Sequence, residues 1–226
     1  MHIISFSNPK GGTGKSTSAL LVAEQLALAG KKVAIIDNDP SQNLLHWRTS
    51  REERGLPALF DVFEKSSPET YDDTIMDLGQ TYDFAVIDME GVKDLMASVV
   101  TMSSDLVVIP MQASPMDARN AASQLSIISL ASRHLKRDIP HVFVFTRTNA
   151  TIATRLYKMI RAEMKNLPIL DTNLVERAAY KHMHEDGSLL SELDPILVSG
   201  LEKAKQNGLD LTRALLNFMK EGSENE

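Results

Sequence analysis

A ten-residue loop near the N-terminus, NPKGGTGKST at residues 8–17, constrains the fold more than any other stretch. An apolar run at residues 2–7 precedes it and a long apolar segment at 16–29 follows, so we expect a strand, a glycine loop and a helix. Glycine tolerates positive φ and lets backbone N–H groups approach an anion, and a helix N-terminus adds partial positive charge. We therefore interpret this stretch as a phosphate-binding loop.

Two side chains of the loop add specific chemistry. Lys15 supplies a full positive charge for β- and γ-phosphate oxygens, and the Ser16 hydroxyl is suited to ligate Mg²⁺. A flexible turn before a helix would explain the glycines but not the sequence Gly-Lys-Ser-Thr. The residues expected to bind the nucleotide here are Gly11, Gly12, Thr13, Gly14, Lys15, Ser16 and Thr17.

Composition limits the remaining possibilities. The 226 residues suffice for one α/β domain, which we expect to span 1–226, and a net charge of −6 argues against a generally basic nucleic-acid binder. The absence of cysteine excludes disulfides and thiolate metal sites. No signal peptide is evident, and no apolar run approaches the roughly 20 residues of a membrane span. We expect a cytoplasmic protein.

Apolar strand-like runs alternate with helical segments along the whole chain. Strands are expected at 2–7, 33–37, 82–88, 104–110, 141–147 and 167–170, with a further short one near 59–63. Helices are expected at 16–29, 42–54, 68–78, 114–135, 151–165, 173–186 and 195–220. This alternation predicts an α/β fold with a doubly wound, mostly parallel sheet.

Acidic residues follow two of these strands. Asp37 and Asp39 lie at the end of 33–37, and Asp88 ends 82–88 in the manner of a Walker B carboxylate. Because α/β sheets bind ligands at the carboxyl ends of their strands, we expect Asp88 to bind Mg²⁺, directly with Ser16 or through water. Turn chemistry alone would also explain the Asp residues before Pro40, and Ser41 is suited to cap the next helix.

The loop departs from the common phosphate-binding pattern in one respect. Pro9 stands where that pattern has glycine, and Lys10 lies directly before the paired glycines. This resembles the deviant Walker A motif of the ParA/MinD family of P-loop ATPases. The resemblance implies that Lys15 serves its own nucleotide, whereas Lys10 reaches across a dimer interface to the partner's phosphates. It also implies that Asp39 positions the attacking water, as the family's switch aspartate does.

The resemblance therefore implies three kinds of site residue. Lys10, Lys15 and Asp39 are the catalytic candidates, and the metal candidates are Ser16, Asp39 and Asp88. In relatives the end of the 141–147 strand contacts adenine, which makes Thr146, Arg147 and Asn149 base-site candidates, although a strand end with a helix cap explains them equally well.

Other segments extend the resemblance. The segment 110–117 is similar to the family's dimer-interface segment, but helix capping by Ser114 explains most of its residues. The late segment 176–180 is also similar to the family's. Glu90 departs from the family pattern, and we interpret it as facing solvent.

The resemblance implies a function as well. A small ParA-type plasmid partition ATPase without an N-terminal helix-turn-helix domain binds ATP and Mg²⁺, forms a homodimer on ATP binding and in some relatives a polymer, and binds DNA non-specifically. A ParB-like centromere-binding protein stimulates its hydrolysis, and the ATP form associates with the nucleoid. Positioning of another cargo, or assistance to conjugative transfer, remains an alternative. A MinD-like membrane role is disfavoured because the chain ends in the acidic segment 221–226.

Several cationic residues have simpler interpretations. Arg48, Arg51 and Arg54 recur every third position and are expected to form a solvated helix face. The basic stripe within 151–165 is given the same reading. The histidines His141, His182 and His184 lie outside any metal-ligand spacing and are expected at the surface or in loops.

Overall fold

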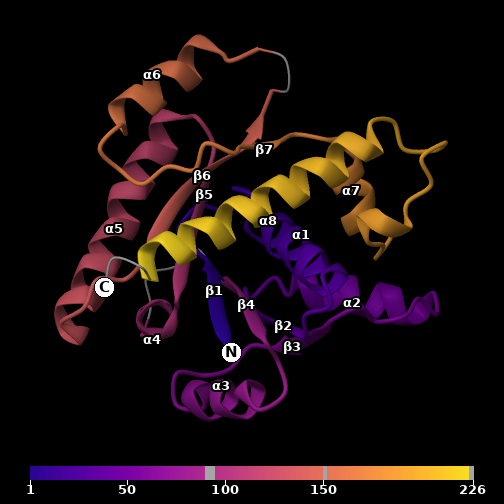
Figure 1. Cartoon of the computed structure of the whole chain (residues 1–226), viewed down its shortest axis with the longest axis horizontal. Helices are drawn as coiled ribbons and strands as arrows, with labels where there is room; N and C mark the ends of the chain where they lie inside the picture. The colour runs from indigo at the N-terminus through magenta and orange to yellow at the C-terminus, as the bar shows by residue number, and fades with distance from the viewer. Residues whose placement is uncertain (90–94, 150–151, 224–226) are drawn as a thin grey trace.

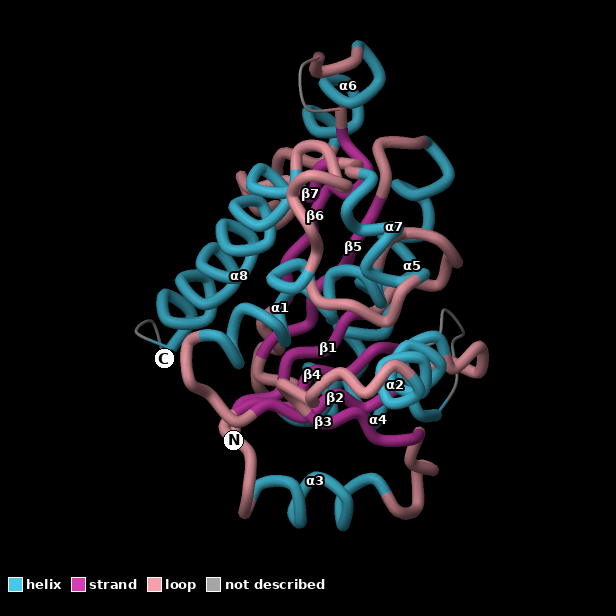
Figure 2. The backbone as a smooth tube through the Cα atoms, turned by 90° about the vertical axis from the view of Figure 1, so that its right-hand side faces the viewer, coloured by secondary structure: helices cyan, strands magenta, loops and turns pink. Residues whose placement is uncertain are grey.

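The computed structural model describes residues 1–89, 95–149 and 152–223. A seven-stranded parallel sheet forms its centre, in the order β3-β2-β4-β1-β5-β6-β7. Figure 2 shows its twist from β3 to β7. The strands are β1 (His2–Phe6), β2 (Val33–Asn38), β3 (Asp61–Glu64), β4 (Phe84–Met89), β5 (Leu106–Met111), β6 (His141–Thr148) and β7 (Leu174–Val175). The predicted doubly wound α/β fold is confirmed.

Helices cover both faces of the sheet (Figure 1). One face packs against α1 (Lys15–Leu28), α2 (Asn43–Glu53), α7 (Ala178–Glu185), the 3₁₀ turn η1 (Leu190–Glu192) and α8 (Leu201–Ser223). The other packs against α3 (Tyr71–Gly79), α4 (Leu95–Ser103), α5 (Pro115–Leu135) and α6 (Arg155–Glu163). Successive strand residues alternate between these layers, as the pleat requires: in β1, Ile4 and Phe6 face α1, whereas Ile3 faces the other layer.

Several predicted boundaries are wrong: residues 174–175 of the helix expected at 173–186 form β7, and the helix expected at 195–220 begins only at Leu201. Residues 167–170 form only an isolated bridge, between Ile169 and Phe143, and the last strand is β7 further along the chain. Pro168 has no N–H group, so this segment cannot extend a regular ladder. The helix expected from residue 151 begins at Arg155, because Thr154 caps it by accepting a hydrogen bond from the Tyr157 N–H at 3.1 Å.

The cap of α2 also differs from the prediction. Ser41 does not cap the helix; the Asp37 carboxylate, at the end of β2, accepts hydrogen bonds from the N–H groups of Leu44 (2.9 Å) and Leu45 (3.1 Å). The carboxylate thus satisfies two donors of the first turn and complements the helix dipole. Asp37 is therefore a structural residue that fixes α2 to the sheet.

The solvated face predicted for Arg48, Arg51 and Arg54 is wrong for Arg51, whereas Arg54 is exposed and Arg48 is half-buried. Arg51 is 3% exposed, and its terminal nitrogens donate to the Glu192 carboxylate at 2.6 and 2.7 Å and to the carbonyl of Gly187 at 3.1 Å. Its guanidinium lies 5.3 Å from the ring centre of Trp47, whose Nε1–H donates to the Met183 carbonyl at 3.0 Å. We call these contacts between α2 and residues 183–192 the α2–α7 polar cluster.

The C-terminal helix α8 crosses α1 (Figure 1). Its residues Leu201, Ala204, Leu211 and Leu215 are buried in the core beneath it. A β-carbon at Gly208 would lie 3.4 Å from the Leu21 side chain, an ordinary van der Waals contact, so α8 packs directly on α1 there. In the described part of the chain no helix is long and apolar enough to cross a bilayer.

Candidate nucleotide and metal site

The carboxyl ends of β1, β2 and β4 converge on one place. The parallel register pairs Asp88 of β4 with Phe6 of β1 on one side and with Asp37 of β2 on the other. Residues paired in a parallel sheet point to the same face, so both carboxylates lie on the α1 side. The glycine loop follows β1 directly, which brings it beside Asp88.

Residues at the ends of the neighbouring strands β5 and β6 hydrogen-bond to the loop backbone. Gly12 and Gly14 have φ of 73° and 91°, conformations that favour glycine. The Gly12 carbonyl accepts from Gln112 Nε2 at 3.0 Å, and the Thr13 carbonyl accepts from Thr146 Oγ1 at 2.7 Å. Because a trans peptide directs its N–H opposite to its C=O, the N–H groups that follow these carbonyls point away from β5 and β6. This arrangement suits an anion at the N-terminus of α1.

Ser16 and Asp88 form the oxygen pair expected for a cation. Ser16 Oγ donates to Asp88 Oδ2 at 2.5 Å, while Asp88 Oδ1 is buried and has no hydrogen-bond partner among the described residues. The pKa of Asp88 is raised to about 7, chiefly by burial; the Ser16 hydrogen bond and the charge of Lys15 oppose the rise, and the charges of Asp37 and Asp39 add to it. An orphaned buried carboxylate oxygen beside a hydroxyl fits Mg²⁺, which prefers oxygen ligands and keeps several waters.

The remaining acids do not complete a closed metal cage. No group of three His, Cys, Asp or Glu residues able to hold a metal occurs in the chain segments described. Asp39 lies beyond β2, and its Oδ1 accepts from the Ser41 N–H at 2.9 Å and the Ser41 hydroxyl at 2.6 Å. Asp39 is near enough to raise the pKa of Asp88. Asp39 therefore lies beside the site but makes no hydrogen bond to Ser16 or Asp88. Glu90 lies outside the described residues.

The two lysines of the loop have different surroundings. Lys15 is buried at 6% exposure, and no hydrogen bond or ion pair of its ammonium is found in the described residues. Lys10 instead donates to Asp117 Oδ2 at 2.9 Å, within the same chain. Asp117 is fully buried at the first turn of α5, where its N–H donates to Ser114 Oγ at 3.1 Å, so the predicted Ser114 cap is confirmed.

One cavity borders the loop, and a second lies at the end of β6. The first, of about 350 Å³, lies between the loop and α7 and is called here the α7 cavity; it is lined by Gly14, Thr17, Thr146, Arg147, Tyr180, Lys181 and His184, among others. The second, of about 740 Å³, lies on the other side of Arg147 and includes Asn149. Both volumes suit a small ligand. Of the base-site candidates, Thr146 and Arg147 border both cavities, whereas Asn149 borders only the second.

Three residues at the site were not identified from the sequence. Asp117 and Gln112 belong to the segment 110–117, but neither side chain is indicated by the sequence as part of the site. His184, expected at the surface, lies on the half-buried side of α7 with its Nε2 2.9 Å from Thr17 Oγ1. Nothing in local spacing indicates these contacts, because each joins residues about 100 positions or more apart in the chain.

The phosphate cradle, the Ser16–Asp88 pair and the all-parallel sheet define a P-loop NTPase with the deviant lysine arrangement. Comparison with known proteins makes the class more specific. The profile of the family described as VirC1 protein matches residues 1–207. Protein ParA of Rhizobium radiobacter is 32% identical over 196 residues, covering 85% of this chain and 86% of that protein. The chain therefore belongs to the VirC1 family of ParA/MinD-type ATPases.

Further relatives agree with this assignment. Protein virC1 of Rhizobium radiobacter is 24% identical over 202 residues, covering 84% of this chain and 83% of that protein. Among solved structures, apo McdA of Cyanthece aligns with a TM-score of 0.74 at 19% identity over 95% of this chain and 99% of its own. A plasmid partition protein of Borrelia burgdorferi bound to AMPPNP aligns at 0.69 and 21% identity, over 93% and 97%. These structures support the fold.

Proposed function

We propose that this protein is an ATP-dependent partition ATPase that hydrolyses ATP to ADP and phosphate with Mg²⁺. The observation that carries the proposal is the Ser16–Asp88 pair beside the glycine loop, in which Asp88 Oδ1 is buried without a hydrogen-bond partner among the described residues. The ATPase family supports the reaction, and residues 1–226 form the proposed catalytic domain.

The chemistry assigned to the chain's own residues is mainly electrostatic. Mg²⁺, held by Ser16 and Asp88, would neutralise charge on the β- and γ-phosphates. The loop N–H groups and Lys15 bind the phosphates and stabilise the charge that develops on the transferring group. Asp39 holds the attacking water, and its place beyond β2 next to this site supports that role.

A second chain completes the site in this proposal. Lys10 leaves Asp117 and contacts the partner's phosphates when ATP closes two chains face to face. The contact with Asp117 supports this, since a lysine with 26% side-chain exposure at one ion pair is near the surface and able to exchange partners. The dimer binds DNA non-specifically, and a ParB-like protein stimulates hydrolysis and releases the dimer.

One relative also supports a different cargo, a protein assembly. The maintenance of carboxysome distribution protein A of Gloeobacter kilaueensis is 32% identical over 118 residues, covering 51% of each chain. The same ATPase cycle would then position a protein assembly instead of a plasmid. A membrane role receives no support from α8, whose buried leucines are engaged with α1.

Nucleotide binding is the first test. Lys15→Ala should abolish binding of ATP, measured by calorimetry on the purified chain, because Lys15 is the cation of the cradle. Lys158→Ala, which alters an exposed lysine of α6, serves as the matched control. Normal ATP binding by Lys15→Ala would refute the site assignment.

Dimerisation and cargo need separate tests. Lys10→Ala should remove ATP-dependent dimerisation in light scattering, and an unchanged dimer would refute the role of Lys10 across the interface.

The ATP form should bind arbitrary duplex DNA, with affinity that falls as salt rises. Absence of binding at low salt would favour the protein cargo.

A further inference from the structure

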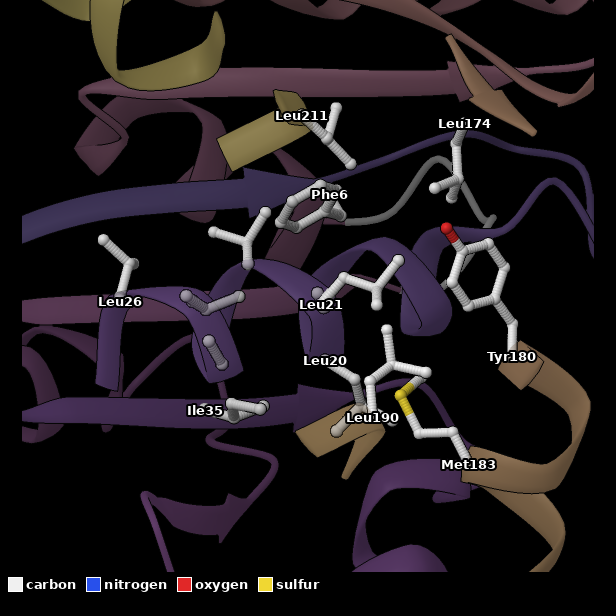
Figure 3. Close-up of a cluster of buried hydrophobic side chains, with 14 of the residues drawn as sticks. Phe6, Leu20, Leu21, Leu26, Ile35, Leu174, Tyr180, Met183, Leu190 and Leu211 are labelled. Atoms are coloured by element: carbon white, nitrogen blue, oxygen red, sulfur yellow. The ribbon is translucent and has the colours of Figure 1, made fainter. Parts of the chain in front are cut away.

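Helix α7 forms one wall of the α7 cavity beside the loop, and it packs against two core helices. Tyr180 and Met183 point into the cluster that surrounds Leu20 and Leu21 of α1 (Figure 3). The Tyr180 hydroxyl also donates to the Ala204 carbonyl of α8 at 3.2 Å. Because both neighbours are core helices, the position of α7 beside the loop is fixed by packing.

This packing brings His184 against the phosphate-binding loop. Its Nε2 lies 2.9 Å from the hydroxyl of Thr17, and both side chains line the α7 cavity. Thr17 follows Lys15 and Ser16 directly at the start of α1. An imidazole therefore lies where an anionic ligand of the loop would extend into the α7 cavity.

The charge of His184 depends on what occupies that cavity. Burial lowers the pKa of His184 below its ordinary value of 6.5, so the imidazole is neutral at neutral pH in the ligand-free chain. Other charged groups line the same cavity, namely Arg147, Glu176, Arg177, Lys181 and Glu185. An anion arriving within a few ångströms favours the protonated imidazole.

We propose that His184 is a positioning residue of the nucleotide site, which holds the Thr17 hydroxyl in the free chain and takes up a proton from solvent when a nucleotide enters. The proposal rests on the proposed nucleotide binding. Protonation supplies one more cation beside the phosphates without any bond being made or broken elsewhere. By linkage, a ligand that raises the proton affinity of a group binds more tightly as pH falls.

Calorimetry with Mg·ADP on the full chain tests this proposal. Titrations at about pH 7, in two buffers of different ionisation enthalpy, give the number of protons taken up on binding. We compare the wild type with His184→Gln, whose amide keeps a hydrogen-bonding group near Thr17 but does not titrate. His182→Gln, at the other histidine of α7, is the matched control.

The wild type and His182→Gln should take up a larger fraction of a proton than His184→Gln. Between about pH 8 and pH 6 their affinity should also rise relative to that of His184→Gln, by up to about tenfold for each unit of pKa change on binding. Equal proton uptake in wild type and His184→Gln, with normal ADP binding, would overturn this inference alone. Failure of the wild type to bind ADP would refute the proposed function as well.

A second measurement needs no variant. An NMR titration of the His184 imidazole in the wild-type chain, with and without Mg·ADP, should show a higher pKa in the presence of nucleotide. An unchanged or lower pKa would overturn the proposal even if His184→Gln failed to fold.

Discussion

Two groups of buried charges lie on the same side of the sheet and behave differently. In the α2–α7 polar cluster the terminal nitrogens of Arg51 are bonded to Glu192 and to backbone carbonyls. At the nucleotide site, Asp88 is equally buried, but one of its oxygens has no partner among the described residues, and its pKa is raised to about 7. The first group stabilises the scaffold, and the second is left incomplete for a ligand.

The difference has a physical origin. A buried charge is tolerated when its hydrogen bonds are satisfied, and it is costly when they are not. The scaffold pairs both terminal nitrogens of Arg51, because α2 and η1 are both part of the fold, and leaves only its Nε without a partner among the described residues. A site that binds Mg²⁺ and phosphate must keep some of its polar groups without protein hydrogen-bond partners, so that the ligand can bind them. The buried Asp88 therefore lowers the folding stability of the ligand-free chain.

The largest effect is expected in the scaffold. Arg51→Met should lower the free energy of unfolding by about 3–5 kcal/mol, because it leaves Glu192 and the carbonyls of Gly187 and Pro57 without their donor. Urea denaturation of the ligand-free chain measures this. A loss below about 1 kcal/mol, which is the range of a surface ion pair, would show that the α2–α7 polar cluster does not stabilise the scaffold as proposed.

Asp88→Asn should raise the free energy of unfolding, the opposite of the effect expected for Arg51→Met. The pKa of Asp88 is raised in the folded chain from 3.8 to about 7, so its contribution to stability is present below about pH 4 and is lost as pH rises through about 7. The amide cannot ionise, so at about pH 8 the variant should be more stable than the wild type by up to about 4 kcal/mol.

Urea denaturation of both proteins across this pH range checks the prediction for Asp88. The gain should shrink as pH falls towards about 4, since the wild-type carboxyl is then protonated as well. Parallel stability curves for the two proteins would contradict the assigned burial cost. Binding of Mg²⁺ with nucleotide should be weakened in the same variant.

The contact between Lys10 and Asp117 is intermediate, because only one partner is buried. Removing the pair in a double-mutant cycle with Lys10→Met and Asp117→Asn should give a coupling of about 1 kcal/mol. Asp117→Asn should also promote ATP-dependent dimerisation, since Lys10 is then released, and sedimentation at several protein concentrations would show this. Weaker dimerisation would contradict the exchange of partners.

The smallest effect is expected at an exposed pair. In α8, Lys205 Nζ lies 3.1 Å from Glu202 Oε1, and the two side chains are 31% and 78% exposed. Lys205→Met should change the free energy of unfolding by about 0.5 kcal/mol or less, because solvent screens the pair. A larger loss would show that burial is not what separates scaffold charges from surface charges.

The sequence alone determined the sheet class, the loop, the Ser16 and Asp88 pair and the Ser114 cap, because each depends on local periodicity or on a short motif. Only the tertiary structure decided where the side chains of distant segments meet. Arg51 and His184 were expected to be solvated, and Ser41 was expected to cap α2. Their surroundings are set by segments more than 100 residues away for Arg51 and His184, and by the sheet for α2. A motif carries its own backbone geometry, whereas burial and pKa depend on what packs against it.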